Sequence, residues 1–203
     1  MIIPTPEAPK YEPVKDLRKI IPLEIGNRWQ FVHIACIDAG PTCRVSDYSY
    51  TIVDTPWIDG KKHYRYNSPD DAITYANYYT DTIDSASYSR SWCLICPRRN
   101  SLAKETGDQY VSFLLLELPL RQGQEWNPAD WDIVYHRYGT LKIESIDTTI
   151  QTKAGKFEHA IFIRSTKDFG YTYLIVPGVG FVHMESGNGF GYDEYALLTT
   201  NFY

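Results

Sequence analysis

The chain contains one eight-residue phrase twice, and this repeat limits the folds that the chain can adopt. Pro22 to Trp29 reads PLEIGNRW and Pro119 to Trp126 reads PLRQGQEW, so both follow Pro-Leu-x-x-Gly-x-x-Trp. Proline favours an extended approach, and glycine permits a sharp turn that other residues resist. The tryptophan would then flank a strand and close one end of the core. The repeat predicts a sheet in two halves with one such entry clamp each, unless two unrelated turns match by chance.

Most of the chain after Pro22 alternates between apolar and polar residues with a period of two, which is typical of half-exposed strands. Residues 47–52 alternate in this way, whereas residues 110–118 are almost continuously apolar and favour a strand covered on both faces. Within 141–150 the apolar phase slips by one residue at Glu144–Ser145. An inserted residue has this effect, so a β-bulge is expected there.

Turn signals divide the last third of the chain into a meander of strands. Gly155 lies in a turn between predicted strands at 141–152 and 157–166, and Pro177-Gly178 turns the chain after a strand at 171–176. Proline sets φ for the first central turn position, and glycine accepts a positive φ at the second.

Helical signals are few, apart from residues 127–131, NPADW, which resemble a capped helical turn. Aromatic residues make up 15% of the chain and favour pleated surfaces. The sequence therefore predicts a mainly β protein with a single curved antiparallel sheet, or half-barrel, of about ten strands. One or two short helices should accompany the sheet.

Four prolines within the first 20 residues set this segment apart from the rest of the chain. They prevent a regular helix or a central strand. We expect residues 1–20 to form a Pro-rich extended arm and residues 21–203 to form a single β-rich domain. The arm could hold the domain away from a membrane anchor or contact a protein partner; alternatively, it is a disordered tail.

Composition and charge exclude several classes of function. The net charge is −5 and the basic residues are scattered, which argues against nucleic-acid binding. No apolar run approaches the roughly 18 residues of a membrane span. The first residues contain no apolar core of a signal peptide. The protein is therefore either cytoplasmic or located in the periplasm or cell envelope after removal of a signal.

The chain contains, in this order, the two copies of the repeated phrase, then Ala154-Gly155-Lys156-Phe157, then Pro177-Gly178-Val179-Gly180. In this order of motifs the chain resembles a broad group of bacterial cell-envelope proteins and lipoproteins of uncharacterised function. The similarity spans about residues 21–186. Several members of this group resemble the open half-barrel of the periplasmic lipoprotein carriers. The resemblance implies a curved antiparallel sheet with an apolar concave face, and it implies no catalytic residues. The chain differs from the group in lacking a lipobox cysteine.

Four cysteines offer several kinds of chemistry. Cys36 and Cys43 bracket a turn-rich loop, and a bridge across this hairpin would contribute about 2–3 kcal/mol in the chain-entropy model. Cys93 and Cys96 would then be paired or close. Alternatively, the four thiolates could bind zinc, the Cys93-x-x-Cys96 pair could be a redox motif, or the thiols are free. A redox motif needs a helix N-terminus after the first cysteine, which Pro97 and the β-rich surroundings do not favour.

Signatures of catalysis are missing from the sequence. The chain contains no nucleophile elbow, phosphate loop or HExxH motif, and its five histidines share no ligand spacing. We therefore expect no enzyme, no cofactor and no metal site. Tyrosine clusters such as YANYY at 75–79 could stack sugars, but cross-strand pairing explains them more simply.

Two functions remain. The first is a non-catalytic envelope domain that binds an apolar ligand or lipid in a concavity of the sheet, which requires a continuous apolar cavity of roughly a few hundred Å³. Its lining would comprise Trp29, Phe31, Phe113, Leu115 and Trp126, although these residues could equally fill a closed core. The second is an accessory or structural subunit of a larger envelope assembly, attached through residues 1–20.

Overall fold

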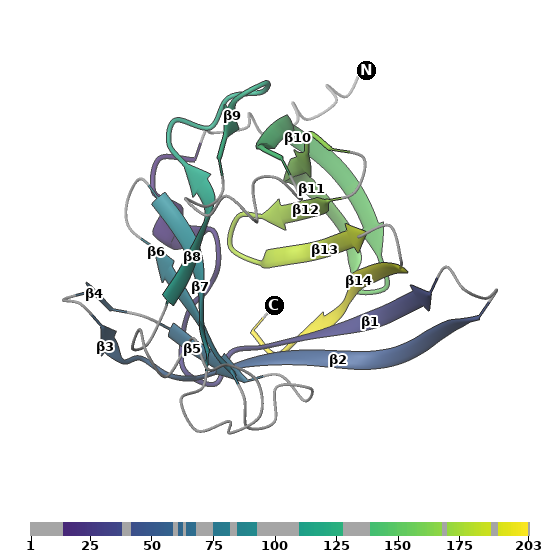
Figure 1. Ribbon diagram of the computed structural model, residues 1–203, viewed down its shortest axis with the longest axis horizontal. Coiled ribbons are helices and arrows are strands. Elements are labelled where there is room, and N and C mark those ends of the chain that lie inside the picture. Colours follow the sequence, from purple (N-terminus) through teal and green to yellow (C-terminus); the bar gives the residue numbers. More distant parts are fainter. Residues whose placement is uncertain are drawn as a thin grey trace, which may run out of the picture.

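A computed structural model describes residues 14–37, 42–58, 61–62, 64–67, 75–81, 85–92, 110–127, 139–167, 170–187 and 191–202. These residues form one antiparallel sheet of twelve strands, a small two-stranded sheet and one short 3₁₀ helix. Figure 1 shows that the large sheet curves, so that β6, β7 and β8 face β11, β12 and β13 across the centre of the molecule.

The large sheet consists of two consecutive six-stranded meanders. The first comprises β1 (Arg28–Ile37), β2 (Cys43–Asp54), β5 (Tyr64–Asn67), β6 (Tyr75–Asp81), β7 (Ser85–Trp92) and β8 (Tyr110–Glu117). The second comprises β9 (Glu125–Trp126), β10 (Leu141–Thr152), β11 (Gly155–Ser165), β12 (Tyr171–Val176), β13 (Gly180–Gly187) and β14 (Gly191–Thr200). The small sheet pairs β3 (Trp57–Ile58) with β4 (Lys61–Lys62).

The two meanders are joined by pairing between the first strand of one and the last strand of the other. β1 pairs with β2 on one side and with β14 on the other, so it lies in the middle of the sheet. β8 and β9 form the two edges, and only residues 118–124 connect them along the chain. The sheet is therefore open, with its one interruption between β8 and β9.

The predicted fold class is confirmed. The structure shows a mainly β chain with a single open, curved antiparallel sheet, although its described residues supply twelve strands where about ten were expected. The one described helix is η1 (Leu17–Lys19). Most of the helical turn predicted at 127–131 lies outside the described residues.

The two copies of the repeated phrase make the same backbone hydrogen bonds. Gly26 N–H donates to Ile52 O at 2.8 Å, and Gly123 N–H donates to Ile143 O at 2.7 Å. Ile52 N–H donates to Asn27 O, and the matching bond joins Ile143 to Gln124, at 3.0 and 2.9 Å. Both glycines have positive φ, +93° and +82°. Each copy is a turn that delivers a tryptophan to the first strand of one meander, as the repeat predicts.

The hairpin signals of the last third also match the structure. β10 and β11 meet at Thr152 and Gly155, and the β10 register shifts between Ile143 and Ser145, where the bulge was expected. At the turn between β12 and β13, Gly178 has φ +80°, and Val179 N–H donates to Val176 O at 2.9 Å.

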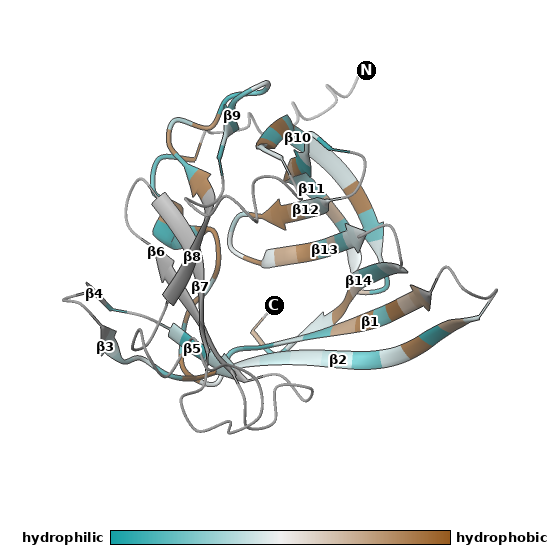
Figure 2. Cartoon of the chain, viewed as in Figure 1, coloured by the Kyte–Doolittle hydropathy of each residue, from teal (hydrophilic) through white to brown (hydrophobic). Residues whose placement is uncertain are grey.

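The core lies between the curved halves of the sheet, and among the residues whose burial is described most of its aliphatic members belong to the second meander. Figure 2 shows hydrophobic residues concentrated on β12 and β13, with alternating hydrophobic and hydrophilic bands along β10 and β1. Ile143, Ile161, Ile163 and Ile175 are fully buried. At the far end of the β10–β11 hairpin Ala154 N–H donates to Leu197 O at 3.3 Å, so this hairpin reaches β14.

The segment before the first phrase is part of the core where it is described. Leu17 and Ile20, which the sequence analysis placed in the arm, are fully buried. Asp16 caps η1 by accepting the Arg18 N–H, and Lys19 O and Ile20 O both accept the Gly178 N–H at 3.0 Å. The spaced prolines could not predict this packing, because the buried residues Leu17 and Ile20 come after Pro13, the last of these prolines. Residues 1–13 of the predicted arm lie outside the described residues.

Candidate functional site

The first phrase buries Trp29 against the turn between β12 and β13. Its side chain is 4% exposed, and its indole Nε1–H donates to Val179 O at 2.7 Å. A Cβ atom at Gly180 would lie 3.2 Å from Ile21 Cγ2 and 3.5 Å from Trp29 Nε1. Two of the motifs that carry the family resemblance, the first Pro-Leu-x-x-Gly-x-x-Trp and Pro177 to Gly180, therefore meet in space.

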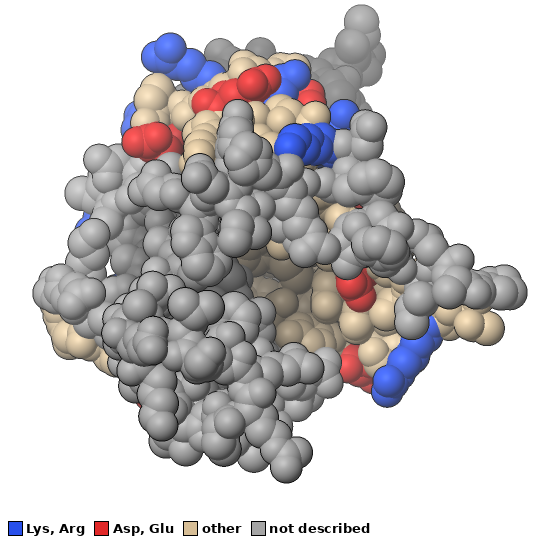
Figure 3. Space-filling view, in the orientation of Figure 1, with Lys and Arg blue, Asp and Glu red and all other residues tan. Residues whose placement is uncertain are grey.

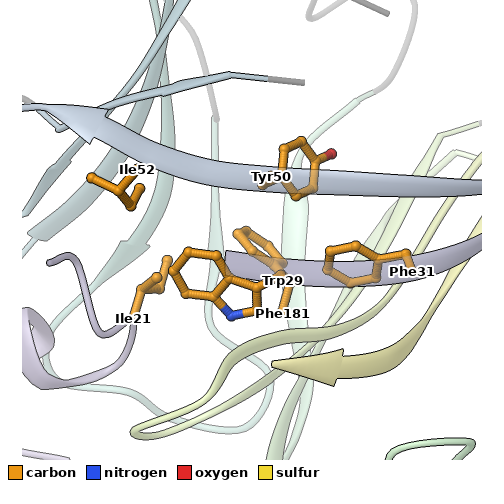
Figure 4. Close-up of a pocket in the computed structure, with 6 residues that line it drawn as sticks. All are labelled: Ile21, Trp29, Phe31, Tyr50, Ile52 and Phe181. Carbon is orange, nitrogen blue, oxygen red and sulfur yellow. The ribbon is translucent and has the colours of Figure 1, made fainter. Parts of the chain in front are cut away.

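A small apolar pocket lies beside this tryptophan (Figure 4). It is lined by Ile21, Trp29, Phe31, Tyr50, Ile52 and Phe181. Its volume of about 10 Å³ has room for about one water molecule. This pocket by itself is far smaller than the few hundred Å³ expected of a carrier cavity.

The face of the sheet beside this pocket carries a continuous group of aromatic rings, here called the aromatic strip: Phe31, His33, Tyr48, Tyr50, Tyr66 and Tyr195. The residues come from β1, β2, β5 and β14, and their positions in register put them on one face of the sheet. Edge-to-face contacts at 5.0 Å link Tyr66 to Tyr50 and Tyr50 to Tyr48. Tyr195 then lies 5.2 Å from Tyr48. The strip thus runs unbroken across the joint between the two meanders.

The strip passes from the core to a polar end. Phe31 is fully buried and Tyr66 is 6% exposed, whereas Tyr48, Tyr50 and Tyr195 are half-buried.

His33 stands at the outer end of the strip and connects its rings to polar groups. Its ring stacks on Tyr195 with the centroids 4.2 Å apart and the planes nearly parallel. His33 Nε2 lies 2.9 Å from Asp193 Oδ1, and Ser46 Oγ lies 3.5 Å from Nδ1. The strip therefore joins an apolar inner part to a polar, partly charged outer end.

The space-filling view shows that the molecule is hollowed on one face (Figure 3). The described surface inside the hollow carries mainly uncharged residues, and acidic and basic side chains gather at the upper end and on the right-hand rim.

The structure shows the Cys36–Cys43 disulfide, with the two Cα atoms 4.2 Å apart. The two cysteines are direct partners across β1 and β2, at the end of their pairing. This confirms the predicted hairpin bridge. Cys93 and Cys96 lie outside the described residues, so their pairing stays a prediction.

The predicted lining residues lie in different parts of the fold. Trp29 and Phe31 line the pocket. Trp126 is half-buried on β9 and packs against the core without lining the pocket. The backbones of Phe113 and Leu115 lie in β8, opposite β7, and their side chains lie outside the described part of the structure.

Sequence reasoning missed four lining residues of the pocket: Ile21, Tyr50, Ile52 and Phe181. The alternation of Tyr48, Tyr50 and Ile52 predicted a strand with one apolar face, and that signal could have identified two members of the site. Phe181 had no such signal, because its approach to Trp29 depends on the docking of the β12–β13 turn.

The opposite face of the sheet carries a polar cluster of His183, Glu185, Tyr192 and Glu194. His183 Nε2 lies 3.0 Å from Glu185 Oε1, and the Tyr192 hydroxyl donates to both carboxylates, at 3.1 and 3.3 Å. Partial burial, together with the two neighbouring carboxylates, raises the pKa of the Tyr192 hydroxyl well above its usual value. The hydroxyl therefore remains a hydrogen-bond donor.

Comparison with known proteins assigns no family to this chain. No protein-family model and no curated protein matches it. Among the crystal structures that resemble it, two do so at 12% sequence identity, and each match covers 90% of this chain and 98% of the other. One is described as a "putative lipoprotein" from Parabacteroides distasonis, with a TM-score of 0.34. The other is described as a "putative exported protein" with a YMCC-like fold from Bacteroides fragilis, with a TM-score of 0.37.

At these TM-scores the two likenesses carry no conclusion about the function of this chain. In the described part of the chain, no helix is both long enough and apolar enough to cross a membrane.

Proposed function

We propose that this chain is a non-catalytic protein of the cell envelope that binds a lipid or another apolar, elongated ligand along its aromatic strip. The observation that carries the proposal is the unbroken run of half-buried rings from Tyr50 through Tyr48 to Tyr195. Rings that are only half-buried leave apolar area that a ligand can cover, at roughly 25 cal/mol per Å².

The residue types suit an amphipathic ligand. A tyrosine offers an apolar ring to an acyl chain and a hydroxyl group to water or to a polar headgroup. The inner end of the strip is closed by Phe31 and Tyr66, and the outer end holds His33 beside Asp193. An acyl chain would therefore lie on the inner rings, with its headgroup near the outer end.

The size of the enclosed pocket limits how such a ligand could bind. The pocket of about 10 Å³ beside Trp29 is too small for an acyl chain, so the proposed ligand lies along the strip and remains partly exposed. Such binding is weaker than binding in a closed cavity, since the ligand buries less of its surface. The proposed function is thus reversible holding of a lipid.

The envelope location is supported by the Cys36–Cys43 disulfide, because structural disulfides persist mainly in oxidising compartments. Thiol counting on the unfolded, unreduced protein from its source tests this part separately. A bridged Cys36–Cys43 pair is expected, and free thiols at both positions would point to a reducing compartment.

Ligand binding is tested with a single-chain phospholipid below its critical micelle concentration, with binding followed by intrinsic tyrosine and tryptophan fluorescence. The double variant Tyr48→Ala/Tyr195→Ala should bind at least about 10-fold more weakly, since it removes two rings of the strip. The matched control is Trp57→Ala, because Trp57 is 72% exposed on the small sheet. Binding that is equal in the wild type and in the folded double variant would refute the proposal.

A further inference from the structure

The polar cluster on the face opposite the aromatic strip contains three side chains that can ligate a metal ion: His183, Glu185 and Glu194. His183 and Glu185 on β13 share a face with Glu194 on β14, because alternate residues of a strand point to the same side. One ligand atom from each of the three side chains lies within 4.8 Å of the other two. Zinc binds nitrogen and oxygen ligands at about 2.0–2.2 Å, which places ligands of one tetrahedral ion about 3.4 Å apart. One ion binds through a single imidazole nitrogen, whereas Glu185 lies beside Nε2 and Glu194 beside Nδ1. Rotation of these side chains would therefore have to bring both carboxylates to the same nitrogen.

The charges of the cluster favour a cation. Glu185 and Glu194 are direct partners across β13 and β14, and like charges in that position destabilise a sheet. Their other neighbours in register, Thr172 on β12 and Ile34 on β1, carry no charge. Within the described part of the chain, His183 is the one ion-pair partner of either carboxylate. Two carboxylates thus share one histidine.

Tyr192 holds the two carboxylates in place from one side. Its hydroxyl donates to Glu185 Oε1 and to Glu194 Oε2, which leaves Glu194 Oε1 on the side of His183, 3.9 Å from its Nδ1. Hydrogen bonds of this kind orient the ligands of many metal sites. Tyr192 is therefore a positioning residue of the cluster rather than a ligand.

We propose that His183, Glu185 and Glu194 bind one Zn²⁺ ion on the outer face of the sheet, with water completing the coordination. One imidazole and two carboxylates suit zinc, whereas Ca²⁺ takes six to eight oxygen ligands and Mg²⁺ rarely uses dedicated protein sites. Because the site lies on the opposite face from the aromatic strip, it is independent of the proposed lipid binding.

Calorimetric titration of the metal-stripped protein with zinc chloride tests the proposal. One ion per chain is expected, and Glu194→Gln and His183→Gln should each weaken binding at least about 10-fold. The matched control is His159→Gln, because His159 forms a similar histidine–carboxylate pair with Asp147 on β10, at 2.7 Å. This control should leave zinc affinity unchanged.

Thermal unfolding distinguishes a metal site from a merely structural ion pair. Without zinc, Glu194→Gln should melt no lower than the wild type, since it removes a like charge opposite Glu185. Zinc should raise the melting temperature of the wild type and leave that of Glu194→Gln unchanged. No zinc binding, zinc binding that persists in His183→Gln/Glu194→Gln, or an equal effect of Ca²⁺ would overturn the proposal.

Discussion

The two copies of the Pro-Leu-x-x-Gly-x-x-Trp phrase share one local structure and differ in what surrounds them. The first copy enters β1, which pairs on both sides, and its Trp29 is buried, hydrogen-bonded to Val179 and 5.0 Å from the Phe202 ring. The second copy enters β9, a two-residue edge strand that pairs with β10 alone, and its Trp126 is half-buried.

Further bonds reinforce the first copy. Asn201 beyond β14 accepts the Arg28 N–H at 2.7 Å and donates to Gly26 O at 3.0 Å. In the second copy, Gln124 Nε2–H donates to Glu117 O at 3.2 Å, which ties the phrase to the end of β8. The local sequence thus determines the conformation of the turn. The position of the following strand in the sheet determines whether the tryptophan is buried in the core. Only the first copy leads directly into the aromatic strip, because Phe31 and His33 follow Trp29 on the same face of β1.

The largest difference should appear when the two tryptophans are truncated. Trp29→Ala should lower the free energy of unfolding by about 3–5 kcal/mol, since it leaves a cavity and an unpaired Val179 carbonyl. Trp126→Ala should cost about 1–2 kcal/mol, because its side chain is already partly exposed. Urea unfolding of both variants measures this difference. Equal losses would mean that sheet position does not govern the role of the phrase.

A smaller difference in stability between the two halves should follow from the Cys36–Cys43 disulfide, which lies in the first half. The second half has no cysteine, whereas Cys36–Cys43 crosslinks β1 and β2. The variant Cys36→Ser/Cys43→Ser should lose about 2–3 kcal/mol of unfolding free energy in the chain-entropy model. Hydrogen exchange should accelerate in the outer parts of β1 and β2 before it does so in β10 and β11. Uniform acceleration throughout the sheet would contradict this local effect.

The smallest difference is expected at the two turn glycines. Gly26→Ala and Gly123→Ala should each cost about 1–2 kcal/mol, because both positions have positive φ and neither Cβ would meet another atom within 4 Å. The two losses should agree within about 0.5 kcal/mol. A clearly unequal pair would show that the two turns are not equivalent, despite their matching hydrogen bonds.

Features that depend on local sequence could be predicted. The bulge near Ser145, the Pro177-Gly178 turn and the Cys36–Cys43 bridge each arise from residues close together in the chain, where turn chemistry and alternation decide the structure. The repeated phrase likewise predicted two matching turns, each leading into the first strand of one half of the sheet.

Features that depend on long-range register could not be predicted. Nothing local indicates that β1 pairs with β14, yet this pairing brings His33 opposite Tyr195 and joins the two halves. The same holds for Glu185 opposite Glu194, which meet only through the register of β13 and β14. The burial of Leu17 was hidden for a related reason, since η1 packs against β7 and the segment after it bonds to the β12–β13 turn, both of which are distant in the sequence.

The aromatic strip as a lipid-binding face is tested most directly by mapping amide and side-chain NMR shifts during titration with a single-chain phospholipid below its critical micelle concentration. The largest shifts should fall on Tyr48, Tyr50 and Tyr195 and on their neighbours in β1, with little change at Glu185 and Glu194 on the opposite face. Saturable shifts confined to the strip would support lipid binding there. Shifts centred elsewhere, or no saturable shifts, would contradict it.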